Sequence, residues 1–78
     1  MNGIKCFGVA REIVEKSECS FDIEGISVGE LRNLLNYKYP AFSKIKGYMV
    51  AVNQVYALDT QILSSKDEVA IIPPVSGG

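Results

Sequence analysis

The sequence predicts an α+β domain of two layers, in which one main helix covers one face of a single sheet. The first observation behind this fold class is the order of patterns along the 78 residues: strand, short helix, strand, helix, then two or three strands. The second is that the main helix carries one apolar stripe, so it needs only one sheet face to cover. The opposite face is left open. An open apolar face often binds a partner, although scattered apolar residues are also common on protein surfaces.

Seven segments make up that order. Alternating apolar and polar residues mark strands, and apolar residues three and four apart mark helices. The expected elements are a strand over residues 4–9, a short helix from Ala10, a strand over 19–24, a helix over 28–38, and strands over 48–52, 55–58 and 69–72. Asn53 and Gln54 form the expected turn of a hairpin. Pro73 ends the last strand because proline cannot donate to the ladder.

The main helix has the best-marked start in the chain. Ser27 is a natural N-cap, and Glu30 three residues later completes a capping box. Ile26 and Leu31 occupy the two positions of a hydrophobic staple. The expected apolar stripe is Leu31, Leu34 and Leu35. Pro40 ends the helix, because the residue before a proline is pushed out of helical geometry.

Composition and charge exclude several classes of function. Eight Lys and Arg against nine Asp and Glu give a net charge of -1, which speaks against nucleic acid as the main partner. No apolar run reaches the roughly 18 residues that span a bilayer, and no signal-peptide core is present. We therefore expect a cytoplasmic protein without a membrane partner. A substrate pocket of roughly 300–1,000 Å³ would hollow out so small a core, so a self-contained enzyme is not expected.

The residues of nucleophilic and metal chemistry are few. The chain has no histidine, which removes the usual general base and the Ser-His and Cys-His pairings. Cys6 and Cys19 are too few for a structural zinc site and lack CxxC spacing, so no metal is expected. In the cytosol we expect two reduced core thiols.

The C-terminal segment is where chemistry is most plausible. Pro73 and Pro74 stiffen the chain after the last strand, and the segment narrows to Gly77 and Gly78. Six residues can reach about 20 Å, which suits delivery of a terminal carboxylate through a narrow channel. A partner that adenylates this carboxylate with ATP makes it an electrophile, and a sulfur nucleophile then converts it to a thiocarboxylate. The residues alone thus indicate a carrier or modifier that acts through its C-terminus.

Three motifs, in order and at the right spacing, carry a resemblance that covers essentially the whole chain. They are Asp67–Gly78 (DEVAIIPPVSGG), Phe7–Glu12 (FGVARE) and Ala51–Gln54 (AVNQ). The chain resembles the sulfur-carrier subunits of molybdopterin synthase, within the ubiquitin-like sulfur-carrier family. Two positions depart from the family pattern. Lys66 stands where relatives often have glycine, which would cost about 1 kcal/mol if the turn is left-handed, and Gly8 stands where alanine is common.

The resemblance implies a fold and a function. The fold is a ubiquitin-like β-grasp domain over residues 1–72, with a mixed sheet of four to five strands and a flexible, extended tail over residues 73–78. Gly78 would be adenylated by a ubiquitin-activating-like adenylyltransferase, converted to a thiocarboxylate, and used to donate sulfur to cyclic pyranopterin monophosphate. The carrier would bind no cofactor, and ATP would be used by the activating enzyme. The residues expected to enter the partner are Pro73, Pro74, Val75, Ser76 and Gly77.

The partner implied by the resemblance is the large subunit of molybdopterin synthase. Two small and two large subunits would form a heterotetramer, with the catalytic pocket in the large subunit. On strand alternation alone, the expected docking residues on the open sheet face are Phe7, Tyr56 and Ile72.

Three other functions stay open at this point. The chain could carry sulfur for thiamin synthesis or tRNA thiolation, although thiamin carriers usually lack the Pro-Pro-Val segment. It could be a ubiquitin-like interaction module or modifier, linked to lysines through Gly78 by an amide bond. It could also be a redox protein that uses Cys6 and Cys19, which predicts a reversible disulfide.

Overall fold

The computed structural model describes residues 2–74, and the expected tail residues 75–78 lie outside this range. Its elements are β1 (Asn2–Cys6), α1 (Gly8–Val14), β2 (Glu18–Phe21), α2 (Val28–Lys38), the 3-10 helix η1 (Pro40–Lys44), β3 (Met49–Val52), β4 (Val55–Tyr56) and β5 (Val69–Ile72). The five strands form one sheet in the order β2-β1-β5-β3-β4. β1 and β5 pair in parallel and the other neighbours are antiparallel. The predicted α+β class and mixed sheet are confirmed.

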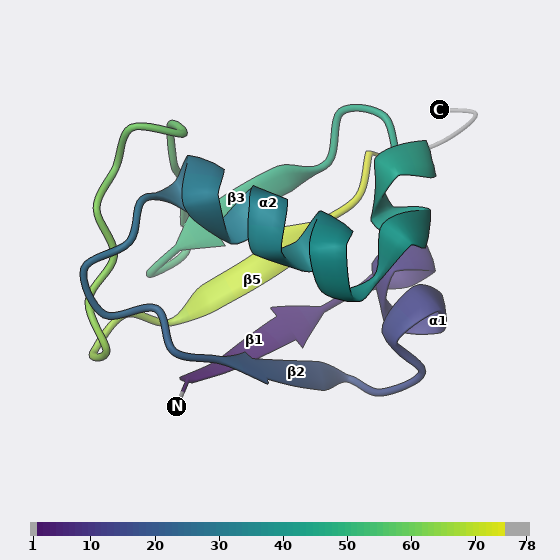
Figure 1. Ribbon diagram of the computed structural model, residues 1–78, viewed down its shortest axis with the longest axis horizontal. Coiled ribbons are helices and arrows are strands. Elements are labelled where there is room, and N and C mark those ends of the chain that lie inside the picture. Colours follow the sequence, from purple (N-terminus) through teal and green to yellow (C-terminus); the bar gives the residue numbers. More distant parts are fainter. Residues whose placement is uncertain (1, 75–78) are drawn as a thin grey trace.

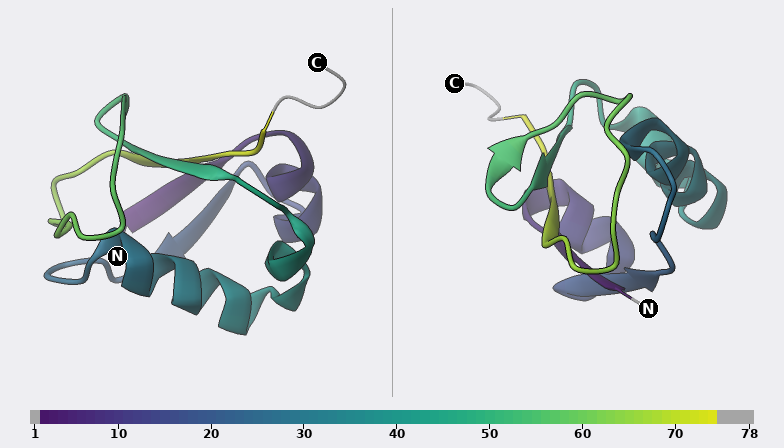
Figure 2. Two further views of the ribbon diagram at one scale, coloured as in Figure 1. Left: turned by 90° about the horizontal axis from the view of Figure 1, so that it is seen from above. Right: turned by 90° about the vertical axis from the view of Figure 1, so that its left-hand side faces the viewer.

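The two layers are α2 and the sheet (Figures 1 and 2). α2 crosses one face of the sheet, and none of the helices in the described part of the chain covers the other (Figure 2). The core lies between the layers and includes Ile4, Val50, Val69 and Ile71 from the strands, and Val28, Leu31 and Leu35 from α2. Burial of this apolar surface is the main stabilising contribution to the fold. None of the helices within residues 2–74 combines the length and apolar character needed to cross a membrane.

The expected apolar stripe of α2 is partly wrong. Leu31 and Leu35 are fully buried, but Leu34 is 39% exposed and Val28 takes its place in the core. At 100° per residue, Leu34 projects about 90° away from the middle of the face formed by the three buried residues. The helix therefore begins burying side chains at its first residue, one turn earlier than the stripe predicts.

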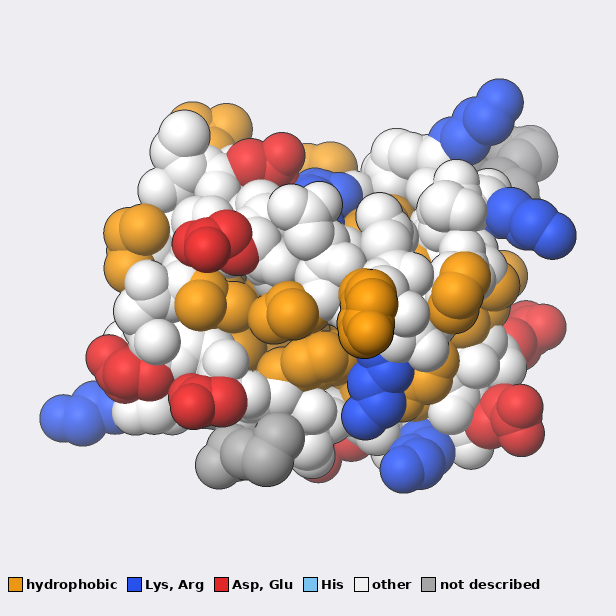
Figure 3. Space-filling model, in the orientation of Figure 1, with side chains coloured by type: hydrophobic (Ala, Val, Ile, Leu, Met, Phe, Trp, Pro, Cys, Tyr) orange, Lys and Arg blue, Asp and Glu red, His pale blue; other side chains and the backbone are white. Residues whose placement is uncertain are grey.

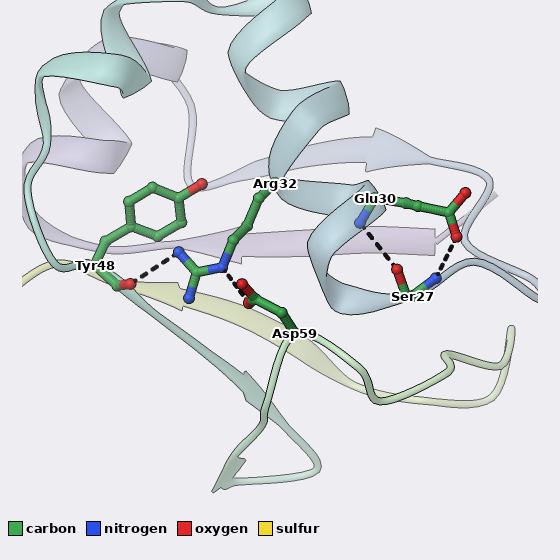
Figure 4. Close-up of polar contacts among 5 residues, drawn as sticks. All are labelled: Ser27, Glu30, Arg32, Tyr48 and Asp59. Carbon is green, nitrogen blue, oxygen red and sulfur yellow. Dashed lines mark hydrogen bonds and ion pairs between the residues drawn. The ribbon is translucent and has the colours of Figure 1, made fainter.

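The predicted start of α2 is confirmed in detail. The Ser27 hydroxyl accepts a hydrogen bond from the Glu30 backbone N–H at 3.0 Å, and a Glu30 carboxylate oxygen accepts one from the Ser27 N–H at 3.0 Å (Figure 4). This is a complete capping box. It satisfies two backbone donors that α2 would otherwise leave without a partner inside the helix.

We expect the substitution Ser27→Ala to lower the free energy of unfolding by about 1 kcal/mol, because an N3 backbone donor loses its acceptor. The midpoint of urea unfolding measures this change. Ser27→Asp is the matched control, since aspartate caps as well as serine and should keep the midpoint near that of the parent chain. Equal midpoints for the alanine and aspartate variants would contradict this role of the cap.

A second polar cluster anchors the long segment between β4 and β5 (Figure 4). Arg32 of α2 donates from Nε to Asp59 Oδ1 at 2.8 Å and from Nη1 to the Tyr48 carbonyl at 3.1 Å. Its guanidinium also lies 4.6 Å from the centre of the Tyr48 ring. The Gly29 N–H donates to the Asp59 carbonyl at 2.9 Å, so the same segment is tied to the first turn of α2. These contacts hold the segment that follows β4 against α2, and from there the chain continues to β5 in the sheet.

The first strand lies earlier in the chain than predicted. β1 begins at Asn2 instead of Ile4 and ends at Cys6, and α1 begins at Gly8, two residues before the expected start at Ala10. Gly8 has a φ of +55°, and a Cβ atom placed there would lie 3.4 Å from Cγ of Pro73. Glycine adopts this left-handed conformation without steric cost. The departure from the family pattern at position 8 thus has a structural reason, and Val9 belongs to a helix.

Smaller corrections concern the ends of other elements. The second strand stops at Phe21 because its β1 partner Asn2 is the first residue of that strand. Ile23 is fully buried outside any strand.

The hairpin turn is confirmed, and Asn53 and Gln54 have φ values of +53° and +70°. Lys66 does not have a left-handed backbone, so the expected strain there is absent.

Candidate docking surface

The uncovered sheet face has small residues at its centre. Strand register places Lys5 beside Ala70, Ala70 beside Ala51, and Ala51 beside Tyr56, so this row runs across four strands. Because side chains alternate between the faces of a sheet, all four members of the row point to the same side. Because the two middle residues of the row are alanines, the centre of the row lies lower than its two ends. We call this centre, formed by Ala51 and Ala70, the floor.

Larger side chains surround that floor. A shallow depression of about 360 Å³ is lined by Lys5, Phe7, Ala51, Gln54, Tyr56, Glu68, Ala70 and Ile72. Phe7 is 50% exposed and Tyr56 is 61% exposed, whereas Ile72 is half-buried. The structure therefore brings Phe7, Tyr56 and Ile72 together around one depression, which we name the docking surface. Their role in binding a partner stays a prediction.

Phe7 reaches this surface although it lies one residue beyond the end of β1. It is the N-cap of α1, with φ -125° and ψ 158°. This is extended backbone, so the alternation of β1 continues for one more residue and directs Phe7 to the open side. Strand alternation predicted the correct side of the sheet for Phe7 because the chain turns only at Gly8.

One ion pair borders the docking surface. Lys5 Nζ lies 2.7 Å from Glu68 Oε2, and about half of each side chain is exposed. The hydrogen bond and charge of Glu68 raise the pKa of Lys5 above 10.5. Together with Gln54, this pair supplies the polar part of a surface that is otherwise apolar. Such a mixture is typical of protein interfaces, which combine an apolar centre with a polar rim.

Five residues that line the docking surface were not predicted as part of it, because the alternation was not carried across all of the strands. They are Ala51 and Ala70 on the floor, Lys5 and Glu68 at the border, and Gln54 of the hairpin turn. The alternating pattern could have placed Lys5, Ala51 and Ala70 on the open face. The pairing of Lys5 with Glu68 could not be read in the same way, because these residues lie 63 positions apart.

The tail begins beside the docking surface. β5 lies in the middle of the sheet, and Ile72 lines the depression immediately before Pro73. Pro73 is half-buried and Pro74 is exposed. Both line a second, open groove with residues of α1 and of the segment that follows α2, including Val9, Glu12, Lys44 and Lys46. The chain therefore leaves the domain next to the surface on which we expect a partner to bind.

The helix-covered side of the molecule is different. Viewed from this side, charged side chains lie around a band of apolar side chains over α2 (Figure 3). Tyr37 is 87% exposed there. This side does not include the depression lined by Phe7, Tyr56 and Ile72, so it offers positions at which to place control substitutions.

The two cysteines are not among the residues that line the docking surface. Cys6 and Cys19 are buried free thiols, as expected, and their sulfur atoms are 3.8 Å apart. Within residues 2–74, no three side chains of the types that ligate metals gather at one point.

Comparison with known proteins gives consistent matches. The ThiS family matches residues 4–78. The molybdopterin synthase sulfur carrier subunit of Caenorhabditis briggsae is 43% identical over 76 residues, which cover 92% of this chain and 90% of the relative. In Pyrococcus furiosus, the solved structure of a molybdopterin converting factor subunit 1 superposes with a TM-score of 0.83 at 23% identity, and 94% and 95% of the two chains are covered. SAMP1, the small archaeal modifier protein 1 of Haloferax volcanii, superposes with a TM-score of 0.76 at 25% identity over 97% of both chains.

Proposed function

The chain belongs to the ThiS family, and from this premise we propose that it is the sulfur-carrier subunit of a molybdopterin synthase. The observation that carries the proposal is the position of β5. This central strand leads directly to Pro73 and Pro74, beside the surface lined by Phe7, Tyr56 and Ile72. A partner that binds this surface would meet the base of the tail at the same time.

We place the reactive group at Gly78. Its carboxylate would attack the α-phosphorus of ATP on an adenylyltransferase, and pyrophosphate would leave. A sulfur nucleophile would then displace AMP from the acyl adenylate and leave a terminal thiocarboxylate. None of these steps needs a catalytic side chain on the carrier, in agreement with a sequence that has no histidine. ATP is a substrate of the activating enzyme in this scheme, and the carrier itself binds no cofactor.

The acceptor chemistry belongs to the large subunit. The charged carrier would bind there through Phe7, Tyr56 and Ile72, and the segment Pro73–Gly77 would enter the active site of the large subunit. Gly78 would then donate its sulfur to cyclic pyranopterin monophosphate. In this assembly, two carriers bind a dimer of large subunits. We treat residues 1–72 as the docking domain and residues 73–78 as the delivery segment.

The intact mass of the protein tests this chemistry. Incubation with the activating enzyme, ATP and a sulfur source should replace one oxygen atom by sulfur, and fragmentation should map the change to Gly78. The matched control omits ATP and should leave the mass unchanged. Addition of the large subunit and cyclic pyranopterin monophosphate should return the carrier to its original mass. If the mass never shifts in the complete mixture, the sulfur-carrier proposal is wrong.

The similarity to SAMP1 favours a second candidate function, that of a protein modifier. In that function, the activated Gly78 carboxyl group would form an amide bond with a lysine of another protein. The same incubation separates the two functions when cell extract is added. A modifier gives products that survive thiol reagents and contain Gly78 joined to a lysine side chain, whereas a sulfur carrier gives the thiocarboxylate.

A further inference from the structure

The two cysteines form a close pair that the proposed sulfur transfer does not use. Cys19 lies on β2 opposite Ile4 of β1, and Cys6 lies two residues further along β1 on the same face. Their sulfur atoms are 3.8 Å apart, and the two residues are only 2% and 3% exposed. Each thiol therefore has the other sulfur as a near neighbour inside the core.

This geometry is close to that needed for a covalent bond. A disulfide needs a sulfur–sulfur distance of about 2 Å. The two sulfur atoms are 3.8 Å apart, so they must move closer together by less than the length of one side chain. Among the strands that the structure describes, β2 lies at the edge of the sheet and pairs with β1 alone, so its other side can adjust. Thirteen positions separate the two residues, and the bond would close a loop that contains α1.

The surroundings distinguish the two thiols. The pKa of Cys19 is lowered, first by hydrogen bonding from Cys6 and then by the charges of Lys38 and Lys16, against an opposing effect of burial. The pKa of Cys6 is raised by the same hydrogen bond and by burial. The hydrogen bond between the two thiols thus favours ionisation of one sulfur over the other, and the thiolate is the form that reacts with oxidants.

A small oxidant has a route to this pair. Cys6 lines a shallow depression of about 210 Å³, together with Lys5, Phe7, Arg11, Ser17 and Glu18. Hydrogen peroxide is small enough to enter through such a depression, whereas a bulky disulfide reagent would have to displace the surrounding side chains. Because both sulfurs are buried, we expect a hydroperoxide to oxidise them more readily than a bulky disulfide reagent does.

We propose that Cys6 and Cys19 are a modification site that closes to an intramolecular disulfide in the presence of a hydroperoxide and reopens with a thiol reductant. In the first step, the thiolate of one cysteine attacks a peroxide oxygen, the O–O bond breaks, and the products are a sulfenic acid and hydroxide. In the second step, the sulfur of the other cysteine attacks the sulfenic sulfur, which releases hydroxide as the proton of that second thiol is lost. Two thiols and one hydrogen peroxide give one disulfide and two waters, and a reductant reverses the change.

The test uses the full chain in native buffer with hydrogen peroxide, followed by alkylation in denaturant and measurement of the intact mass. The oxidised protein should lose two hydrogen atoms, take up no alkylating reagent, and give one peptide that joins Cys6 to Cys19. Treatment with dithiothreitol before alkylation should restore two labelled thiols. Two thiols that remain fully alkylated after peroxide, or disulfides formed only between separate chains, would overturn the proposal.

Single-cysteine variants provide the matched controls. Cys6→Ala and Cys19→Ala keep a small apolar side chain in the core, and neither can lose two hydrogens within one chain. In each variant, a sulfenic acid on the remaining cysteine has no second thiol to attack it, so we expect it to persist and to react with dimedone. If the variants fail to fold, the wild-type measurement still decides, because the mass and the joined peptide need no variant. Absence of the dimedone adduct in both folded variants would contradict the sulfenic acid step.

Discussion

A chain that lacks Gly78 should fold, bind its large subunit, and transfer no sulfur. Removal of one residue shortens the delivery segment by about 3.5 Å, and the new terminal carboxylate would then belong to Gly77. Even a displacement of about 1 Å can reduce a reaction rate 100-fold, because the reacting atoms must meet in a near-attack geometry. We therefore expect transfer to fall to the background rate when product formation is measured with a purified large subunit.

The matched control for this deletion is Ser76→Ala. It changes one residue of the tail but keeps the length, the two glycines and the terminal carboxylate, so sulfur transfer should stay close to that of the parent chain. Binding to the large subunit should be the same for both variants, since Phe7, Tyr56 and Ile72 are unchanged. Measurable sulfur transfer by the chain without Gly78 would refute the delivery mechanism.

The second large effect is expected for Phe7→Ala. Phe7 is 50% exposed in the isolated domain and lines the depression together with Ile72. Aromatic residues that fill the centre of an interface commonly contribute about 2 kcal/mol or more to binding, which corresponds to roughly a 30-fold or larger rise in Kd. Titration calorimetry with the large subunit measures this change.

Tyr37→Ala is the control for the docking surface. Tyr37 is an aromatic residue that is 87% exposed, but it lies on α2, on the opposite side of the sheet from the depression. Its removal should leave the Kd unchanged. Circular dichroism should show that both variants keep the fold. If Tyr37→Ala weakens binding and Phe7→Ala does not, the partner binds the helix-covered side.

Features with local causes were predicted well from the sequence. The capping box at Ser27 and Glu30 depends on two residues three positions apart, and its pattern is visible before any tertiary contact is known. The hairpin turn at Asn53 and Gln54 is equally local, since asparagine tolerates the positive φ that the turn requires and Gln54 follows it with a positive φ of its own. In each case the deciding contacts lie within a few positions of the chain.

Features with distant causes were predicted less well. The first strand ends early because Gly8 turns the chain against Pro73, which is 65 positions away. Leu34 has the apolar character of a core residue, but the orientation of α2 on the sheet leaves it 39% exposed. The depression of the docking surface depends on Ala51 and Ala70 lying side by side. The residue pattern within one segment does not show which distant segments will lie beside it in the fold.

The central place of β5 has a consequence for synthesis on the ribosome. Val69 of β5 pairs with Ile4 of β1 and also with Val52 of β3. The central strand of the sheet is therefore missing until almost the whole chain has been synthesised. Pairing over such sequence separations also makes folding slower than in domains built from local contacts. A prematurely terminated chain would lack both the tail and the strand that completes the core. Incomplete carriers should therefore be unfolded and open to proteolysis, so that they do not occupy the partner without being able to deliver sulfur.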